Sequence, residues 1–349
     1  MSFVVKSSLL SERTLRTSQE LVEAGLVSLE QRENLERVAQ RYATAIPPDF
    51  LALIEHPNDP IALQVVPSEQ ELTITQAERS DPIGDETFSP VPGIVHRYAD
   101  RALLKPLLIC PLYCRFCFRR EHVGPDGGIL SDAVLNVALE WLRTHVQIRE
   151  VILTGGDPLI LSPRRLAMIM QALENIAHIT TIRIHTRVPV AAPDYVTDSL
   201  LDVLESEKAV WIAVHINHAR ELSSKARQCL RRIVRRGIPL LGQSVLLRGV
   251  NNTEQALENL FRAMVENRIR HYYLHHLDRA PGTERFYVSM QEGQRLLAGL
   301  RGRVTGLAWP IYALDIPGGY GKIPLGPNYI DGPLRVRDPS GRSHDLEQL

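Results

Sequence analysis

Residues 103–117, LLKPLLICPLYCRFC, join a run of apolar residues to three closely spaced cysteines. The apolar run has the length and composition of a buried strand. Cys110, Cys114 and Cys117 follow it with C-x3-C-x2-C spacing, and they are three of the four cysteines in the chain. Because cysteines so close together do not suit a disulfide framework, the stretch predicts a metal site at the end of a strand.

Strand-like and helix-like segments alternate in the sequence after this strand. Helix-like segments begin near Ser131, Pro163, Thr197, Glu221, Thr253 and Ser289. Between them lie the strand-like runs EVILTGGD (150–157), TIRIHTR (181–187), VWIAVHIN (210–217), PLLGQSVLL (239–247) and IRHYYLHHLD (269–278). Six repetitions with crossovers of this length predict an α/β fold with a parallel sheet, either open or closed as a partial (β/α)6 barrel.

The residues before and after this pattern divide the chain into three expected parts. Residues 1–91 form an N-terminal helical region and linker, in which the stretch 56–94, rich in proline, glycine and acidic residues, is predicted to be an extended connection outside any core. Residues 92–305 form the partial barrel, and residues 306–349 form a C-terminal extension.

Composition excludes several classes of protein. The chain has 349 residues, 44% of them hydrophobic, and its 40 basic side chains balance 40 acidic ones. That balance gives no general attraction to nucleic acid or to an anionic membrane surface, and neither is expected as a partner. Because the sequence has neither an apolar run of about 18 residues nor a secretory signal, we expect a cytoplasmic protein.

Unusual polar residues fall at the carboxyl ends of the predicted strands. The cysteines follow the first strand, Gly155-Gly156-Asp157 ends the second, and further polar residues end the third, fourth and sixth, namely Arg187, His215 and Asp278. Barrel enzymes place their chemistry on this rim. The pattern therefore favours the barrel and an active site at its mouth.

The cysteine spacing suits an iron–sulfur cluster with one open position. A [4Fe–4S] cluster normally takes four cysteines, so three leave one iron free to bind S-adenosylmethionine. The alternative is a zinc site completed by His122, as in a zinc-stabilised binding protein without enzymatic activity. Cys229, in a basic helical stretch, is interpreted as a buried structural residue.

Seven motifs resemble, in order, those of the lysine 2,3-aminomutase family of radical S-adenosylmethionine enzymes. They are HRYADRALL, CRFCFRR, LTGGDPL, HTRVPV, HINH, GQSVLLRGVNN and DIPGGYGK, and the resemblance spans roughly residues 81–322. It implies an isomerase with a [4Fe–4S] cluster, S-adenosylmethionine and pyridoxal 5'-phosphate that moves an amino group and converts L-α-lysine to β-lysine.

The resemblance also implies roles for individual residues. Cys110, Cys114 and Cys117 would hold the cluster. Contacts to S-adenosylmethionine are implied for Gly155, Gly156, Asp157, Arg187, His215 and Asn217. Pyridoxal phosphate would be bound by Lys322 through its aldehyde, by Arg101 through its phosphate, and by Gln243 near its ring. Without the family, Lys322 would be interpreted as a solvated loop residue and Arg101 as the surface partner of Asp100.

Three charged residues are candidates for substrate binding. Arg119, two residues after Cys117, is placed to hold an amino-acid carboxylate, and the family also has arginine there. Asp278 and Asp315 come from distant segments, and two carboxylates at one mouth would repel each other unless a cation lay between them. A lysine ammonium fits this arrangement, and arginine remains an alternative substrate.

The short members of the family provide the closer resemblance. Longer members carry C-terminal cysteines for a structural zinc, whereas no cysteine follows Cys229 here. Because some short relatives isomerise lysine for attachment to elongation factor P, the product could serve either that modification or free β-lysine metabolism. An external electron donor is expected, the oligomeric relatives suggest self-association, and a radical enzyme that has lost pyridoxal phosphate is a rival.

Overall fold

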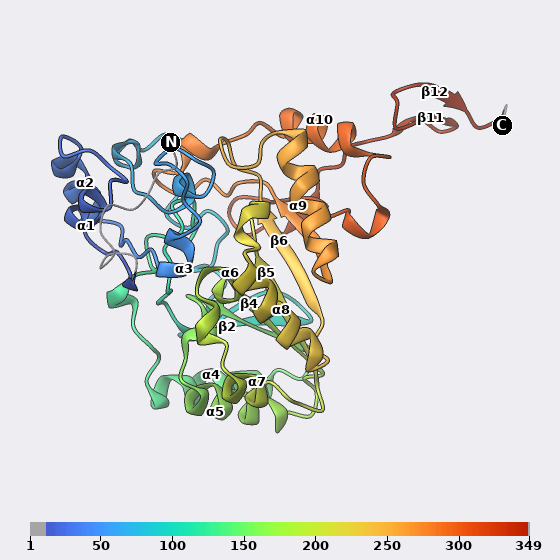
Figure 1. The fold of residues 1–349 in the computed structure, drawn as a ribbon. Coiled ribbons are helices and arrows are strands. Elements are labelled where there is room, and N and C mark those ends of the chain that lie inside the picture. The colour runs from blue at the N-terminus through green and yellow to red at the C-terminus, as the bar shows by residue number, and fades with distance from the viewer. Residues whose placement is uncertain (1–11, 348–349) are drawn as a thin grey trace.

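The structure is a computed structural model that describes residues 12–347. The first eleven residues of the expected N-terminal region and the last two of the C-terminal extension lie outside the described residues. Within the described part, one long sheet carries most of the architecture (Figure 1).

This sheet has nine strands in the order of the sequence, from β1 to β9. The parallel strands are β2 (Arg101–Leu107), β3 (Glu150–Gly155), β4 (Thr181–Thr186), β5 (Ala209–His215), β6 (Leu240–Val245), β7 (Ile269–His275) and β8 (Ile311–Asp315). Antiparallel strands β1 (Ile94–Tyr98) and β9 (Lys322–Pro324) form the two edges. The predicted α/β partial barrel with six βα units is confirmed, and β8 adds a parallel strand that the sequence pattern did not predict.

Helices connect the parallel strands and cover the outer face of the sheet (Figure 1). The main ones are α4 (Asp132–Thr144), α5 (Pro163–Glu174), α7 (Asp198–Val203), α8 (Ser224–Arg235), α9 (Glu254–Glu266) and α10 (Met290–Leu300). Each begins after a serine or threonine whose hydroxyl accepts a backbone N–H of the first turn. These caps explain why the predicted starting points are close to the observed ones.

Alternation along the strands separates the core from the interior of the barrel. In β4, Ile182 and Ile184 are fully buried against the helices. Arg183 and His185 point the other way and line a cavity inside the curved sheet. The periodicity of two therefore gives the barrel a packed outer layer and a polar inner surface.

The N-terminal residues form a second, smaller core beside the carboxyl end of the sheet. Its buried side chains come from α1 (Ser18–Glu23), α3 (Pro48–Leu51), the 3-10 turn η2 (Ala62–Gln64) and the segments beside them, and the same region also holds α2 (Arg32–Ala39) and the 3-10 turn η3 (Glu69–Leu72). Ile61 and Val65 are fully buried in it. The prediction that residues 56–94 lie outside any core is therefore wrong in this part, because a few apolar side chains outweigh the polar composition around them.

The C-terminal residues form a small antiparallel sheet that projects from the body (Figure 1). It consists of β10 (Ile330–Gly332), β11 (Arg335–Arg337) and β12 (Ser343–Asp345). No helix between residues 12 and 347 has both the length and the apolar character needed to cross a bilayer.

Candidate active site

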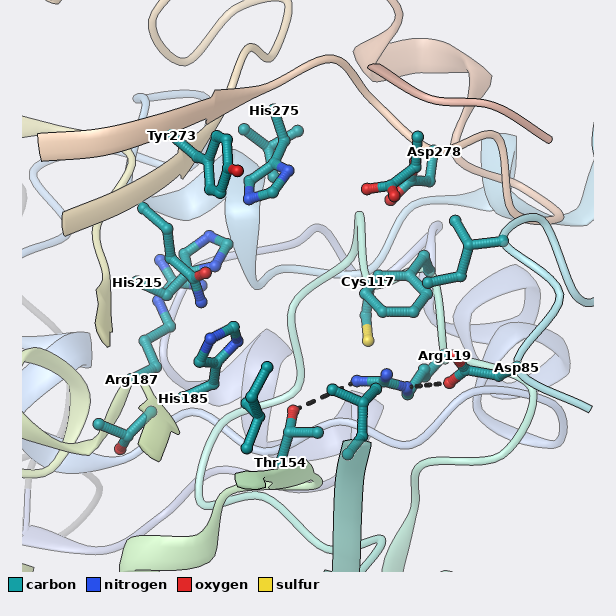
Figure 2. Close-up of a pocket in the computed structure, with 18 of the residues that line it drawn as sticks. Asp85, Cys117, Arg119, Thr154, His185, Arg187, His215, Tyr273, His275 and Asp278 are labelled. Atoms are coloured by element: carbon teal, nitrogen blue, oxygen red, sulfur yellow. Dashed lines mark hydrogen bonds and ion pairs between the residues drawn. The ribbon is translucent and has the colours of Figure 1, made fainter. Parts of the chain in front are cut away.

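A cavity of about 630 Å³ opens at the carboxyl end of the parallel strands, within the range usual for cofactor and substrate sites. Most residues predicted from the sequence line it: Arg101, Cys110, Cys114, Cys117, Arg119, Gly156, Asp157, Arg187, His215, Gln243, Asp278, Asp315 and Lys322. Gly155 and Asn217, also predicted, stand outside this lining. Figure 2 shows the side chains that converge on the cavity from opposite walls.

The three cysteines lie on the loop after β2, which the N-terminal core holds in place. The backbone N–H of Arg115 donates to the carbonyl of Gln64 at 2.8 Å, and that of Tyr113 donates to Ala45 at 3.3 Å. Burial raises the pKa of the Cys114 thiol, and it raises that of Cys117 to about 11. All three cysteines therefore face the cavity from a loop whose backbone is fixed on its far side.

The arrangement of possible ligands bears on the two metal sites considered for these cysteines. Among residues 12–347, no three His, Cys, Asp or Glu side chains are grouped as ligands of one metal ion. A [4Fe–4S] cluster takes cysteine thiolates as ligands, and all three thiols line the cavity. His122, the expected fourth ligand of a zinc site, instead pairs with Glu86 at 3.4 Å and is largely exposed.

Gly155 and Gly156 allow the end of β3 to pack against the start of the cysteine loop. A Cβ on Gly155 would lie 2.6 Å from the carbonyl oxygen of Leu107, and one on Gly156 would overlap the carbonyl of Ile109. The N–H of Gly156 donates to Leu107, and that of Asp157 donates to Ile109. In this structure the glycines serve this backbone contact, in addition to any approach of a cofactor expected from the sequence.

Asp157 joins the ends of two strands. One carboxylate oxygen accepts the Thr186 hydroxyl at 2.7 Å, and the other accepts the backbone N–H of Arg187 at 2.7 Å. Although these hydrogen bonds act in the opposite direction, burial raises the pKa of Asp157. The carboxylate thus fixes the position of Arg187 on the rim.

Arg187 reaches from β4 to the cysteine loop. Its Nη1 donates to the Sγ of Cys114 at 2.8 Å, and its Nη2 donates to Gln64 at 2.6 Å and to Glu221 at 2.9 Å. Gln64 also accepts the side-chain amide of Asn217, which is fully buried. Asn217 therefore supports the rim from behind in this structure and does not reach the cavity.

Two histidines present unpartnered nitrogens on the same wall. The Nε2 atoms of His185 and His215 are buried and have no hydrogen-bond partner among the residues that the structure describes. His215 stacks on Phe116 with ring centroids 5.6 Å apart. Burial, assisted by Arg187, lowers the pKa of His215 to about 3, so its ring is neutral. Buried nitrogens without partners fit a wall that receives a polar ligand.

Lys322 projects into the cavity because of the register between the last two strands. It pairs with Asp315 across β8 and β9, and the two side chains form an ion pair. The amine lies 3.2 Å from the Nδ1 of His275, and Arg97 reaches the other oxygen of Asp315 at 3.2 Å. The Lys322 backbone N–H donates to Tyr98 on β1, which links the two edges of the sheet.

Arg119 is held by two other residues of the cavity wall, Asp85 and Thr154 (Figure 2). Its Nε donates to Asp85 at 2.6 Å, and its Nη1 donates to Thr154 at 3.3 Å. Although burial opposes it, the Arg119 guanidinium lowers the pKa of Asp85. These two contacts orient the guanidinium, whose other N–H groups are available for an anionic group.

Asp278 faces the cavity from the loop after β7 (Figure 2). Burial, together with the nearby Asp315 carboxylate, raises the pKa of Asp278 to about 7. The two aspartates predicted from distant segments therefore do act on each other. A carboxylate with such a pKa is stabilised by any cation that binds beside it.

Arg101 and Gln243 both line the cavity. The Arg101 guanidinium lies over the Tyr98 ring at 3.9 Å, and it also pairs with Asp100 at 2.7 Å, as the simpler interpretation expected. Gln243 neighbours His215 on the adjacent strand. Both positions are compatible with a phosphate and a ring bound in this cavity.

Several lining residues were not singled out from the sequence. His185 shares the inward face of β4 with Arg183, so the alternation along the strand could have indicated it. His275 lies 47 positions before Lys322, and Asp85 lies in a loop rich in acidic residues. No local signal distinguishes these two residues, because their roles arise from contacts between distant segments.

Comparison with known proteins agrees with this geometry. Residues 104–276 match the model of the radical SAM superfamily, and residues 297–333 match a model described as lysine-2,3-aminomutase. The chain is 36% identical over 318 residues to the L-lysine 2,3-aminomutase of Acetoanaerobium sticklandii, covering 90% of this chain and 77% of that protein.

Two further relatives differ in the substrate that their names specify. A putative L-lysine 2,3-aminomutase of Aquifex aeolicus is 35% identical and covers 91% of this chain and 87% of its own length. A glutamate 2,3-aminomutase of Clostridioides difficile is 33% identical and covers 86% of this chain and 71% of its own length. Similarity alone therefore does not choose between a basic and an acidic substrate.

Proposed function

The chain belongs to the lysine 2,3-aminomutase family of radical SAM enzymes, and from that premise we propose that it converts L-α-lysine to β-lysine. It is an isomerase that uses a [4Fe–4S] cluster, S-adenosylmethionine and pyridoxal phosphate. When bound, the cluster and S-adenosylmethionine supply hydrogen abstraction, and pyridoxal phosphate supplies a carrier for the migrating amino group. An external one-electron donor completes the system.

The residues present fit these groups. Three thiols face the cavity, and unpartnered nitrogens of His185 and His215 line its wall. The amine of Lys322 lies inside the same cavity. We propose that Cys110, Cys114 and Cys117 hold the cluster, that Arg187 and His215 contact S-adenosylmethionine, and that Lys322, Arg101 and Gln243 hold pyridoxal phosphate.

The observation that favours lysine is the pair of carboxylates, Asp278 and Asp315. Asp315 already pairs with Lys322 and Arg97. Burial and the Asp315 charge, by contrast, keep the pKa of Asp278 raised, so Asp278 would repel an acidic substrate side chain and would be stabilised by an ammonium. Arg119, oriented by Asp85, lines the same cavity, acts on Asp278 through its charge, and suits the substrate carboxylate. The cavity thus offers a cation for the carboxylate of lysine and a carboxylate for its side-chain ammonium.

The other side chains position and protect the reacting groups. Because burial lowers the pKa of His275 well below its ordinary value, its neutral ring accepts a hydrogen bond from Lys322 and orients the amine. The rings of Phe116 and Tyr273 line the same cavity and add apolar surface to its wall.

Substrate choice is tested by comparing lysine, arginine and glutamate as substrates of the reconstituted enzyme. We expect β-lysine to form fastest, and Asp278→Asn to lower kcat/KM for lysine on the order of 100-fold, because it removes one charge partner of a buried ammonium. Asp126→Asn, on an exposed loop, is the matched control and should leave the rate unchanged. Faster turnover of glutamate, or full activity of Asp278→Asn, would refute the proposal.

A further inference from the structure

A buried group of four charged residues lies behind the cysteine loop, on the side away from the large cavity. Glu71 is fully buried, and its carboxylate accepts from Arg115 at 3.0 Å, forms an ion pair with Arg120, and lies 3.5 Å from Arg285. Glu71, Arg115, Arg120 and Arg285 are called the Glu71 cluster below. They connect the N-terminal core, the cysteine loop and the loop after β7.

The Glu71 cluster carries more positive than negative charge. Although burial alone would raise it, Arg115 and Arg120 hold the pKa of Glu71 down to about 2. Burial lowers the pKa of Arg285 to about 10, which leaves it charged at neutral pH. One carboxylate therefore faces three guanidiniums.

This excess charge is adjacent to the cysteines. Arg115 lies between Cys114 and Cys117 in the sequence. Arg115 and Arg120 share with all three cysteines the lining of a small cavity of about 50 Å³ behind the loop. Both arginines are almost completely buried, at 1% and 6% exposure for the whole residue, so solvent screens their charge only weakly.

On the other side of the loop each arginine has a carboxylate of its own, although Asp85 also lies 3.8 Å from Lys105. Arg187 is paired with Glu221, and Arg119 is paired with Asp85. A purely structural support would be expected to balance its charges in the same way, because unpaired buried charges are costly. The excess at the Glu71 cluster therefore points to a negatively charged group that it stabilises.

An iron–sulfur cluster on three thiolates is such a group, and it becomes more negative on reduction. Resting on the proposed function, we infer that the Glu71 cluster raises the reduction potential of the [4Fe–4S] cluster by stabilising its reduced state. The step is a one-electron transfer from a low-potential donor that converts [4Fe–4S]2+ to [4Fe–4S]1+, with no bond formed or broken. Net charge near the sulfur ligands is a recognised determinant of this potential.

Contacts with nearby backbone fix the position of Glu71, and so they fix the place of the Glu71 cluster behind the cysteine loop. Glu71 is the third residue of a capping box that begins at Ser68, and it accepts the Ser68 backbone N–H at 2.9 Å. Gly282 packs on the backbone of Glu71, where a Cβ would overlap its carbonyl oxygen. The carboxylate therefore stays between the cysteine loop and the loop after β7.

The inference is tested by redox titration of the reconstituted cluster, followed by electron paramagnetic resonance in protein whose iron content has been measured. In Arg120→Gln we expect the ratio of reduced to oxidised cluster, at the wild-type midpoint, to fall by about threefold or more. Arg120→Lys keeps the charge and should restore the wild-type ratio. If Arg120→Gln binds no iron, Arg285→Gln removes one positive charge from the same Glu71 cluster at a position outside the cysteine loop.

Shifts of the midpoint potential in opposite directions in two variants distinguish an effect of charge from structural damage. Glu71→Gln removes the negative charge and should raise the reduced fraction, whereas damage to the loop would move both variants in the same direction. Arg41→Gln is the control, because Arg41 is partly exposed and paired with Glu121. Unchanged midpoints, or shifts of the same sign in Arg120→Gln and Glu71→Gln, would overturn the inference. A wild-type chain that bound no iron would instead overturn the proposed function on which it rests.

Discussion

Replacing Asp278 by asparagine should stabilise the protein without cofactors while it damages lysine binding. Burial and the Asp315 carboxylate raise the pKa of Asp278 from 3.8 to about 7. Between pH 3.8 and about 7, the folded chain therefore keeps a proton on Asp278 that the unfolded chain has lost. The free energy of unfolding of the wild type falls as the pH rises through this range. Asparagine resembles the neutral acid and does not show this loss.

The size of the effect follows from the interval between the two pKa values. An interval from 3.8 to about 7 corresponds to about 4 kcal/mol of unfolding free energy. Because the carboxylate faces an open cavity and not protein on all sides, solvent screening reduces this free energy. We therefore expect Asp278→Asn to be more stable than the wild type by about 2 kcal/mol at pH 8. The difference between variant and wild type should shrink as the pH falls toward 4.

Urea unfolding followed by circular dichroism, at pH 5 and pH 8, measures this difference. Asp126→Asn, at an exposed position, is the control and should unfold like the wild type at both values. If Asp278→Asn were less stable than the wild type at pH 8, or if its advantage did not depend on pH, the reasoning about the two aspartates would be refuted.

Three further substitutions test other parts of the site. Gly156→Ala places a Cβ against the Ile109 carbonyl, so we expect stability to fall on the order of 3 kcal/mol and less iron to bind after reconstitution. Gly306→Ala, with open space around the new Cβ, is the control and should change neither quantity. Lys322→Ala should abolish the covalent adduct that borohydride reduction forms with pyridoxal phosphate, as detected by peptide mass spectrometry; an adduct that persisted would contradict the assignment. Arg119→Lys loses the Nε contact to Asp85, and KM for lysine should rise by about tenfold or more, while an unchanged KM would remove Arg119 from substrate binding.

Much of the barrel could be predicted from the sequence because its signals are local. Runs of β-branched residues mark β3, β4 and β5, and capping residues such as Ser131 and Thr253 mark the starts of the helices between strands. The polar residues at the strand ends then fall on one rim, since parallel strands place their carboxyl ends together. This is why most of the candidate residues line one cavity.

The remainder depends on contacts that no local pattern encodes. The segment containing Ile61 and Val65 is buried because the cysteine loop packs on it, although its composition resembles a linker. Strand β8 is only five residues long, and its pairing with β9 brings Asp315 to Lys322. Asp85, the partner of Arg119, and His275, the partner of Lys322, also come from distant segments, so no local pattern predicts either contact.

The central claim is tested most directly by an anaerobic assay of the reconstituted chain with L-lysine, pyridoxal phosphate, S-adenosylmethionine and a reductant. Chromatography with mass detection should show β-lysine, and none should form when S-adenosylmethionine is omitted. Cleavage of S-adenosylmethionine without β-lysine would leave the cluster assignment standing and contradict the choice of lysine. If neither product appeared from protein shown to hold the cluster, the aminomutase account itself would be contradicted.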